Sequence, residues 1–175
     1  MRRPLALLAL TVAAAFGTSL AAHAFVSSRG YQNADLRIRE FKIPAGWEMV
    51  RQIGYPRIVV LASSSDGARL TFAVQRVATG ASALTLAADA RAALERQHFG
   101  EARISPESES RVRLDANFDG GRGVLRQEYI LDGDLAYVLT LVGPQTRAAR
   151  CEKEFGETLR SLVIAPFFVA DGGAP

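Results

Sequence analysis

The stretch "LDANFDGGRG" carries the residues whose types and spacing most resemble a chemical site. Asp115, Asn117 and Asp119 occupy alternate positions and Gly120 follows, which is how a calcium-binding loop begins. The twelfth position of such a loop needs a bidentate Glu, but Arg126 stands there, so a cation would replace the last ligand. Asn, Asp and Gly are also the residues that a hairpin turn needs. We therefore expect a turn, with a weak calcium site as the alternative and no other cofactor.

Cys151 and His98 are the remaining candidates for nucleophilic or metal chemistry. The chain has one cysteine, and His98 is the only histidine after residue 23. Zinc sites take three or four protein ligands, so these two residues cannot build one within a single chain. A catalytic thiolate would need a base beside it, and the two residues belong to different predicted helices. We expect Cys151 to be a buried thiol and His98 to pack at a helix end.

The closest pair of carboxylates lies in "LDGDL". Asp132 and Asp134 flank a glycine, and acids in this setting are usually solvated turn formers. Nothing nearby suggests the apolar pocket that would raise one carboxyl pKa for acid catalysis. We therefore predict a protein that is not an enzyme. A hydrolase that uses carboxylates from separate loops is an alternative.

Three aromatic residues are candidates for binding a partner. Trp47 follows "PAG" and is either an exposed anchor or a core side chain, and the large apolar area of Trp favours the core. Phe167 and Phe168 lie beyond the last predicted helix. They either fold back onto the sheet or form an exposed apolar patch of the kind that marks interaction sites. The sequence leaves these two alternatives open.

The N-terminal residues predict export. Two arginines precede the apolar run "LALLALTVAAAFG" and the small-residue end "AHA", a pattern typical of a cleavable secretory signal. The apolar run is shorter than the ~20 residues that cross a bilayer as a helix. We expect cleavage near Ala24 and a mature chain without a membrane span, located in the periplasm or outside the cell. Retention as an anchor is the weaker alternative.

Charge and cysteine content narrow the classes of partner. The chain has 21 Lys and Arg against 18 Asp and Glu, interspersed in sign without a basic cluster, so a nucleic-acid partner is not expected. Arg37 and Arg39, like Arg111 and Arg113, alternate with apolar residues and indicate the solvent-facing side of strands. A single cysteine excludes an internal disulfide, so stability must come from packing. We expect a monomer.

Hydrophobic periodicity predicts strands interrupted by two helices. Apolar residues recur at every fourth position over residues 82–100, which predicts a helix there. A second predicted helix begins near Pro144 and has an apolar stripe through Cys151 and Phe155. In "LRIREFKI" the alternation slips at Glu40, which indicates a bulge. The predicted strands are residues 36–43, 48–53, 57–63, 68–77, 111–115, 123–131 and 135–142.

This order of elements predicts an α+β fold: an antiparallel β-sheet of about six strands with helices packed on it. The length after removal of the leader suits one ordinary domain. The predicted organisation is a signal peptide at residues 1–24, a flexible segment at 25–35, a single domain at 36–164 and a tail at 165–175.

Three segments together resemble the exported bacterial relatives of the PsbP/Mog1 fold. They are "FKIPAGWEMV", "GGRGVLRQEYILDGDLAYVLTLV" and "FGETLRSLVI", with a helix between the first two, and the likeness spans residues 31–164. The resemblance implies an α/β/α sandwich of the DcrB/LpqN-like kind. The lipobox of some relatives is missing, so a lipid anchor is not expected.

The resemblance also implies a non-enzymatic role. Better-known relatives bind protein partners, as an extrinsic photosystem subunit or as a regulator of a nuclear GTPase, and the bacterial members are envelope proteins. We therefore expect an exported accessory protein that binds an unknown envelope protein. No partner-binding residue carries over by motif, and a small-ligand or calcium-binding module remains an alternative.

Overall fold

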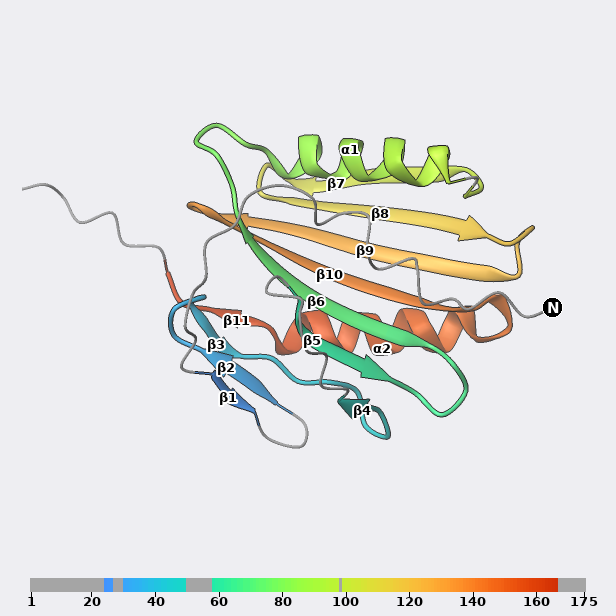
Figure 1. Ribbon diagram of the computed structural model, residues 1–175, viewed down its shortest axis with the longest axis horizontal. Helices are drawn as coiled ribbons and strands as arrows, with labels where there is room; N and C mark the ends of the chain where they lie inside the picture. Colours follow the sequence, from blue (N-terminus) through green and yellow to red (C-terminus); the bar gives the residue numbers. More distant parts are fainter. Residues whose placement is uncertain (1–23, 27–29, 50–57, 98, 167–175) are drawn as a thin grey trace, which may run out of the picture.

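Two antiparallel sheets and two helices make up the fold (Figure 1). The computed structural model describes residues 24–26, 30–49, 58–97 and 99–166. The large sheet has seven strands in the order β4-β5-β6-β10-β9-β8-β7, and the small sheet has four in the order β1-β2-β3-β11. The α+β class predicted from the sequence is thus confirmed.

The elements of the two sheets and the helices have the following bounds. The large sheet consists of β4 (Glu48–Met49), β5 (Ile58–Ser63), β6 (Arg69–Arg76), β7 (Ala102–Ser108), β8 (Arg111–Phe118), β9 (Gly123–Asp132) and β10 (Leu135–Pro144). The small sheet consists of β1 (Ala24–Val26), β2 (Tyr31–Asn33), β3 (Ile38–Glu40) and β11 (Val163–Ile164). The helices are α1 (Ala83–Arg96) and α2 (Ala148–Ser161), and the 3-10 turn Gln145–Arg147 precedes α2.

The large sheet separates two hydrophobic cores because its strands alternate side chains between its faces. On one face α2 and the small sheet pack over Phe72 and Tyr137, and Phe155 of α2 lies in the same core; all three are fully buried. On the other face α1 packs over β7, β8 and β9, with Leu114 and Tyr129 in its core. Each large side chain buried in this way stabilises the fold by about 1.5–3 kcal/mol.

The helix α1 lies close to its sheet because its buried face consists mainly of alanine. Ser82 caps its N-terminus, since the Ser82 hydroxyl accepts a hydrogen bond from the Thr85 amide at 3.0 Å. The helix ends at Arg96, four residues before Gly100, the residue at which the sequence predicted its end. The residues of α1 that face the core are Ala83, Ala87, Ala90 and Leu94.

The predicted bulge near Glu40 is confirmed by the pairing of β2 with β3. Asn33 pairs with Ile38, whereas the Tyr31 amide donates to the Phe41 carbonyl at 2.9 Å. Two residues on β2 therefore oppose three on β3, which is the definition of a bulge. The alternation slips because the extra residue shifts the side chains to the other face.

The prediction that residues 25–35 are flexible is wrong for the part that forms β2. Tyr31 and Asn33 are buried, and the Asn33 side chain donates to the Tyr31 hydroxyl at 2.9 Å. The same amide oxygen accepts from the Leu36 backbone at 3.1 Å. This buried hydrogen bonding orders a segment whose composition alone indicates a linker.

Strand β7 was not predicted from the sequence. Pro106 interrupts its alternation, and Arg103 and Glu107 are charged; proline and charge are both features of the outermost strand of a sheet. The chain between residues 50 and 57, where the prediction extended the strand that begins at residue 48, lies outside the described residues. Among the helices that the structure describes, none is both long and apolar enough to span a bilayer.

The packing of β10 against α2 predicts a specific steric conflict. A Cβ at Gly143 would lie 2.8 Å from the Cys151 Sγ and 3.2 Å from the Ala68 Cβ. Gly143→Ala should therefore lower the free energy of unfolding by roughly 1–3 kcal/mol, as overpacking does. Removing the sulfur with Cys151→Ala in the same chain should recover part of that loss.

Urea unfolding of the two single variants and the double variant measures this coupling. The loss in the double variant should be smaller than the sum of the two single losses. Additive losses would show that the glycine and the thiol do not compete for the same space.

Candidate functional site

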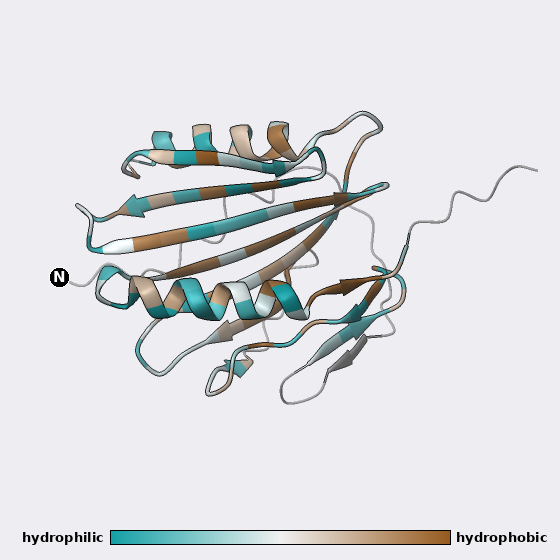
Figure 2. Cartoon of the chain, turned by 180° about the vertical axis from the view of Figure 1, so that it is seen from behind, coloured by the Kyte–Doolittle hydropathy of each residue, from teal (hydrophilic) through white to brown (hydrophobic). Residues whose placement is uncertain are grey.

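The side of the large sheet that faces α2 is only partly covered by that helix. Helix α2 packs on β10 and β9, so the strands β8 and β7 extend beyond it. Figure 2 views the molecule from this side and shows hydrophilic segments recurring along these outer strands. We call this open surface the arginine face, after Arg103, Arg111, Arg113 and Arg126.

Strand register brings the charged groups of the arginine face together. Asp115 lies opposite Arg126 on β9 and opposite Arg103 on β7, so all three point to one side of the sheet. Both oxygens of Asp115 accept from the Arg113 Nε at 3.0 Å. The Arg126 Nε lies 3.2 Å from an Asp115 oxygen.

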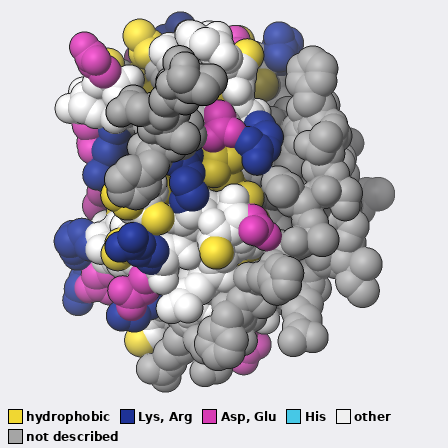
Figure 3. Space-filling view, turned by 90° about the vertical axis from the view of Figure 1, so that its left-hand side faces the viewer, with side chains coloured by type: hydrophobic (Ala, Val, Ile, Leu, Met, Phe, Trp, Pro, Cys, Tyr) yellow, Lys and Arg dark blue, Asp and Glu magenta, His cyan; other side chains and the backbone are white. Residues whose placement is uncertain are grey.

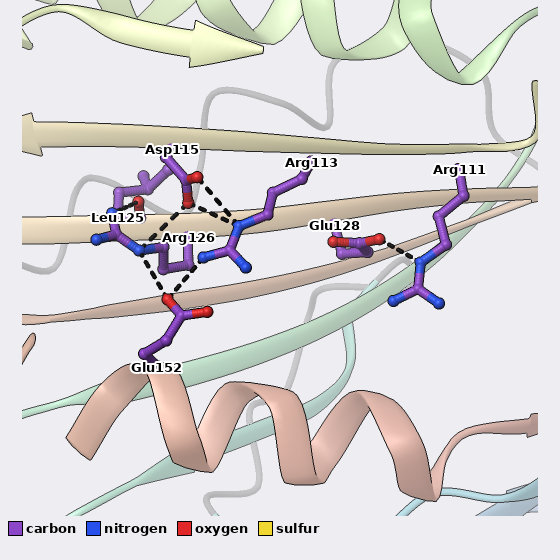
Figure 4. Close-up of polar contacts among 7 residues, drawn as sticks. All are labelled: Arg111, Arg113, Asp115, Leu125, Arg126, Glu128 and Glu152. Carbon is purple, nitrogen blue, oxygen red and sulfur yellow. Dashed lines mark hydrogen bonds and ion pairs between the residues drawn. The ribbon is translucent and has the colours of Figure 1, made fainter. Parts of the chain in front are cut away.

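Helix α2 contributes the second acid of this network (Figure 4). The Glu152 Oε2 accepts from the Arg113 Nη2 at 2.6 Å and from the Arg126 Nε at 3.3 Å. The Arg113 guanidinium also lies 5.9 Å from the centre of the Phe155 ring, at the edge of the range of a cation–π contact. Two strands and a helix are therefore tied together by one set of shared charges.

These contacts change the protonation equilibria of the network in a consistent direction. The hydrogen bond from Arg113 lowers the pKa of the Glu152 carboxyl. The hydrogen bond to Glu152 in turn raises the pKa of Arg113. The side chains of Arg113 and Arg126 are 23% and 19% exposed, so the network is partly shielded from solvent without being sealed. The Glu152 carboxyl and the Arg113 guanidinium therefore both favour their charged forms.

A second ion pair on the same face is buried on its acidic side. Glu128 is fully buried, and its Oε1 accepts from the Arg111 Nε. Its Oε2 is buried without a hydrogen-bond partner. Burial raises the pKa of this carboxyl, because the charged form loses its hydration. Arg111 is still 40% exposed, so its remaining nitrogens reach solvent.

Arg103 completes the face as a free cation. It lies on the edge strand β7, and its side chain is exposed and makes no ion pair or hydrogen bond with any residue that the structure describes. Arg111 and Arg113 lie on the side of β8 opposite the α1 core, as the sequence predicted, but both are paired with acids, which the sequence did not predict. Glu152, the partner of Arg113, is 39 positions away in the sequence, a separation over which periodicity gives no signal.

The candidate calcium residues do not converge in the structure. Asp115 is engaged by two arginines, Asn117 is exposed further along β8, and Asp119 lies in the hairpin turn. Asp119 has a φ of 55° and pairs with Arg122 at 2.7 Å. No cluster of three or more His, Cys, Asp or Glu side chains that could hold a metal occurs in the described part of the chain. These positions favour the turn over the calcium site.

The other acidic candidates, Asp132 and Asp134, join the two sheets. They lie in the turn between β9 and β10, where the Asp132 Oδ2 is 3.0 Å from the Arg37 Nη1. Asp134 lies 3.7 Å from the Arg37 Nη2 and also pairs with Arg76. The Tyr137 hydroxyl adds a hydrogen bond to the Leu36 carbonyl at 2.9 Å. Figure 3 shows basic, acidic and hydrophobic side chains interleaved at this end of the molecule.

The remaining candidates separate into buried and undescribed residues. Trp47 is 5% exposed and belongs to the core, so the interpretation as an exposed anchor is wrong. Cys151 is fully buried as predicted, and burial raises the pKa of its thiol. His98, Phe167 and Phe168 lie outside the described residues.

Comparison with known proteins identifies the fold. No family model matches the chain, and no curated protein sequence does. The solution structure of cyanobacterial PsbP (CyanoP) from Synechocystis sp. PCC 6803 matches with a TM-score of 0.59 and 13% sequence identity, covering 85% of this chain and 98% of that one. The chain therefore has a PsbP-like fold, as its sequence resemblance implied. An identity this low establishes the fold alone.

The two buried or paired glutamates predict opposite pH dependences. Glu128 has a raised pKa in the folded state, so it removes stability as the pH rises from about 4.5 through that folded pKa. Glu152 has a lowered folded pKa, so its contribution is present above about 4.5 and is lost as the pH falls. The free energy of unfolding of Glu128→Gln, measured relative to the parent chain, should therefore be more favourable at pH 8 than at pH 5. Glu152→Gln should be less stable than the parent chain at neutral pH.

Urea unfolding between pH 3 and pH 8 checks both signs with two variants of the same substitution type. The difference between the Glu152→Gln variant and the parent should close at the acidic end. Parallel pH profiles for the two variants would contradict the assignment of a buried and a paired carboxylate.

Proposed function

We propose that this chain is an exported, non-catalytic accessory protein that binds another component of the cell envelope through the arginine face. The observation that carries the proposal is the preset orientation of Arg113 and Arg126, whose guanidinium groups are held by Asp115 and Glu152. Side chains ordered before binding lose less entropy when a partner arrives. Arginine is also enriched in protein interfaces.

The groups that could perform catalysis have structural roles in the described part of the chain. The Cys151 thiol is sealed in the core and its pKa is raised, which disfavours the reactive thiolate. Asp132 and Asp134 both pair with Arg37, which joins the two sheets. These placements support a binding role over the hydrolase and the calcium-dependent alternatives.

The partner should present carboxylates to this face. Asp115 and Glu152 already pair with guanidinium nitrogens of Arg113. The Arg103 side chain, in contrast, is unpaired among the described residues, and Arg111 is half-exposed. Carboxylates on the partner would meet the outer guanidinium nitrogens with favourable geometry. Electrostatic complementarity of this kind raises the rate of association and the specificity more than it raises affinity.

The location and the organisation of the chain form part of the proposal. The N-terminal pattern supports export with cleavage near Ala24, and the domain, predicted over residues 36–164 and extended by β2, would act as a monomer. The PsbP-like fold supports a kinship with the exported DcrB/LpqN-like proteins.

Affinity capture of the tagged, exported protein from its native envelope after mild crosslinking tests this function. Arg103→Glu reverses the free charge on the arginine face, and Arg69→Glu makes the same change at an exposed position on the opposite side of the sheet. We expect a single partner that Arg103→Glu releases, with an affinity about tenfold weaker, or about 1.4 kcal/mol. The Arg69→Glu control should retain that partner.

Two results would contradict the proposal. Retention of the partner by the Arg103→Glu variant would place the interface elsewhere on the molecule. Failure to capture any reproducible partner would favour the ligand-binding or enzymatic alternatives, which thermal shifts with ions and metabolites would then distinguish.

A further inference from the structure

A buried acid lies beneath the arginine face. Glu128 on β9 is fully buried, and its carboxylate points toward Arg111 (Figure 4). The Glu128 Oε1 accepts from the Arg111 Nε, while the Glu128 Oε2 is buried without a hydrogen-bond partner. Ionisation is unfavourable where a carboxyl oxygen has neither water nor a donor beside it. The protonated form of Glu128 is therefore more accessible than that of an exposed glutamate.

Arg111 is shared between this buried acid and an exposed one. Its Nε also lies 3.0 Å from the Glu107 Oε2 on β7. Arg111 and Arg113 stabilise the ionised form of Glu128, whereas Glu107 destabilises it. When the Glu128 carboxyl takes up a proton, the buried ion pair becomes a neutral contact. The half-exposed Arg111 guanidinium keeps its charge and is then open to other acids.

The elements on either side of Glu128 leave Arg111 as the group that compensates its charge. The cross-strand neighbour of Glu128 on β10 is Leu139, which is apolar and buried. Helix α2 directs Glu152 toward the face, and Glu152 takes up the charge of Arg113. The state of the Glu128–Arg111 pair is therefore decided by the Glu128 carboxyl itself.

The ionisable groups of the arginine face cancel in number. The face has four arginines, and the acids that pair with three of them are Glu107, Asp115, Glu128 and Glu152. When every member of this set is ionised its net charge is zero, so an acidic partner meets attraction and repulsion together. When Glu128 is protonated the set carries one net positive charge. The buried acid thus decides the sign that a partner meets.

The pKa shifts on the face separate Glu128 from the acids around it. Burial raises the pKa of the Glu128 carboxyl, whereas the hydrogen bond from Arg113 lowers the pKa of Glu152. Exposed carboxyl groups on a partner have pKa values of about 4. As the pH falls from neutral, Glu128 is therefore protonated before Glu152 and before the carboxylates of the partner. In that range the face is cationic while the partner is still anionic.

We propose that Glu128 is a proton-operated switch beneath the arginine face: its protonation releases Arg111 from the buried ion pair, and an acidic partner then binds more tightly. This inference rests on the proposed function, because it concerns the same face and the same kind of partner. The coupling of two binding equilibria is reciprocal, so binding of the partner also draws a proton onto Glu128.

Nuclear magnetic resonance of the full chain follows the switch without any partner. The glutamate carboxyl groups carry carbon-13 and the arginine side chains carry nitrogen-15. We expect a carboxyl signal that is absent from Glu128→Gln to titrate well above the value of 4.5 that is ordinary for glutamate. The Arg111 Nε–H signal should change with the same midpoint. Titration of Glu128 at or below the ordinary value, or an Arg111 signal that does not follow it, would overturn the proposal.

Dextran sulfate serves as an acidic probe, because its negative charge does not change between about pH 5 and pH 8. The affinity of the parent chain for this probe should rise about fivefold from the higher to the lower pH, as expected for one added charge near the contact. Glu128→Gln should lose that rise. The matched control Glu107→Gln removes an exposed charge from the same face and should keep it.

The two variants and the captured envelope partner separate this inference from the proposed function. Equal pH dependence of Glu128→Gln and Glu107→Gln with dextran sulfate would overturn the switch. A partner that Arg103→Glu releases, but that binds the parent chain equally at both pH values, would also overturn the switch and leave the proposed function intact. If the titration and the probe give the expected results but no partner is captured, the switch stands and the proposed function fails.

Discussion

Strand β10 is buried on both faces, and the rest of the structure depends on that constraint. It pairs with β9 over its whole length and with β6 over most of it, so neither edge is open. Tyr137 and Leu139 point into the core under α2, while Val138 points into the core under α1. A strand covered twice needs an almost uninterrupted apolar sequence, and "LAYVLTLV" supplies one. The two cores therefore share this strand as their common wall.

The arginine face results from the limited width of α2. One helix covers about two strands, because interaxial and interstrand spacings are about 10 Å and 4.8 Å. With α2 placed over β10 and β9, the outer strands need polar side chains on that face. Arg113 and Arg126 meet this need and also fasten the helix through Glu152. The same two arginines therefore line the open surface and hold α2 in place on the sheet.

Sequence periodicity predicted the parts of the fold in which one side of an element is buried. The strands β6, β9 and β10 alternate or run apolar, and α2 repeats Cys151 and Phe155 on one side, so their existence followed from local pattern. Strand β7 was missed because an edge strand with Pro106 need not alternate. The arginine network was not predicted because its members come from β8, β9 and α2. Pairing between charges that are distant in the sequence produces no local sequence pattern. The core position of Trp47, favoured from its large apolar area, is confirmed, although the sequence alone left an exposed anchor as the alternative.

Helix α2 carries two paired acids: Glu152 fastens it to the sheet, and the partners of the buried Glu154 lie on α2 itself and in the 3-10 turn before it. Glu152 pairs with Arg113 and Arg126 of the sheet, whereas the buried Glu154 accepts from Arg150 at 2.9 Å and lies 3.5 Å from Arg147. A helix fixed only by apolar contacts could slide along its groove, but paired charges specify one position. Because Glu152 orients Arg113 and Arg126, any shift of α2 would also change the geometry of the arginine face. The surface available to a partner is therefore coupled to the packing of the core beneath it.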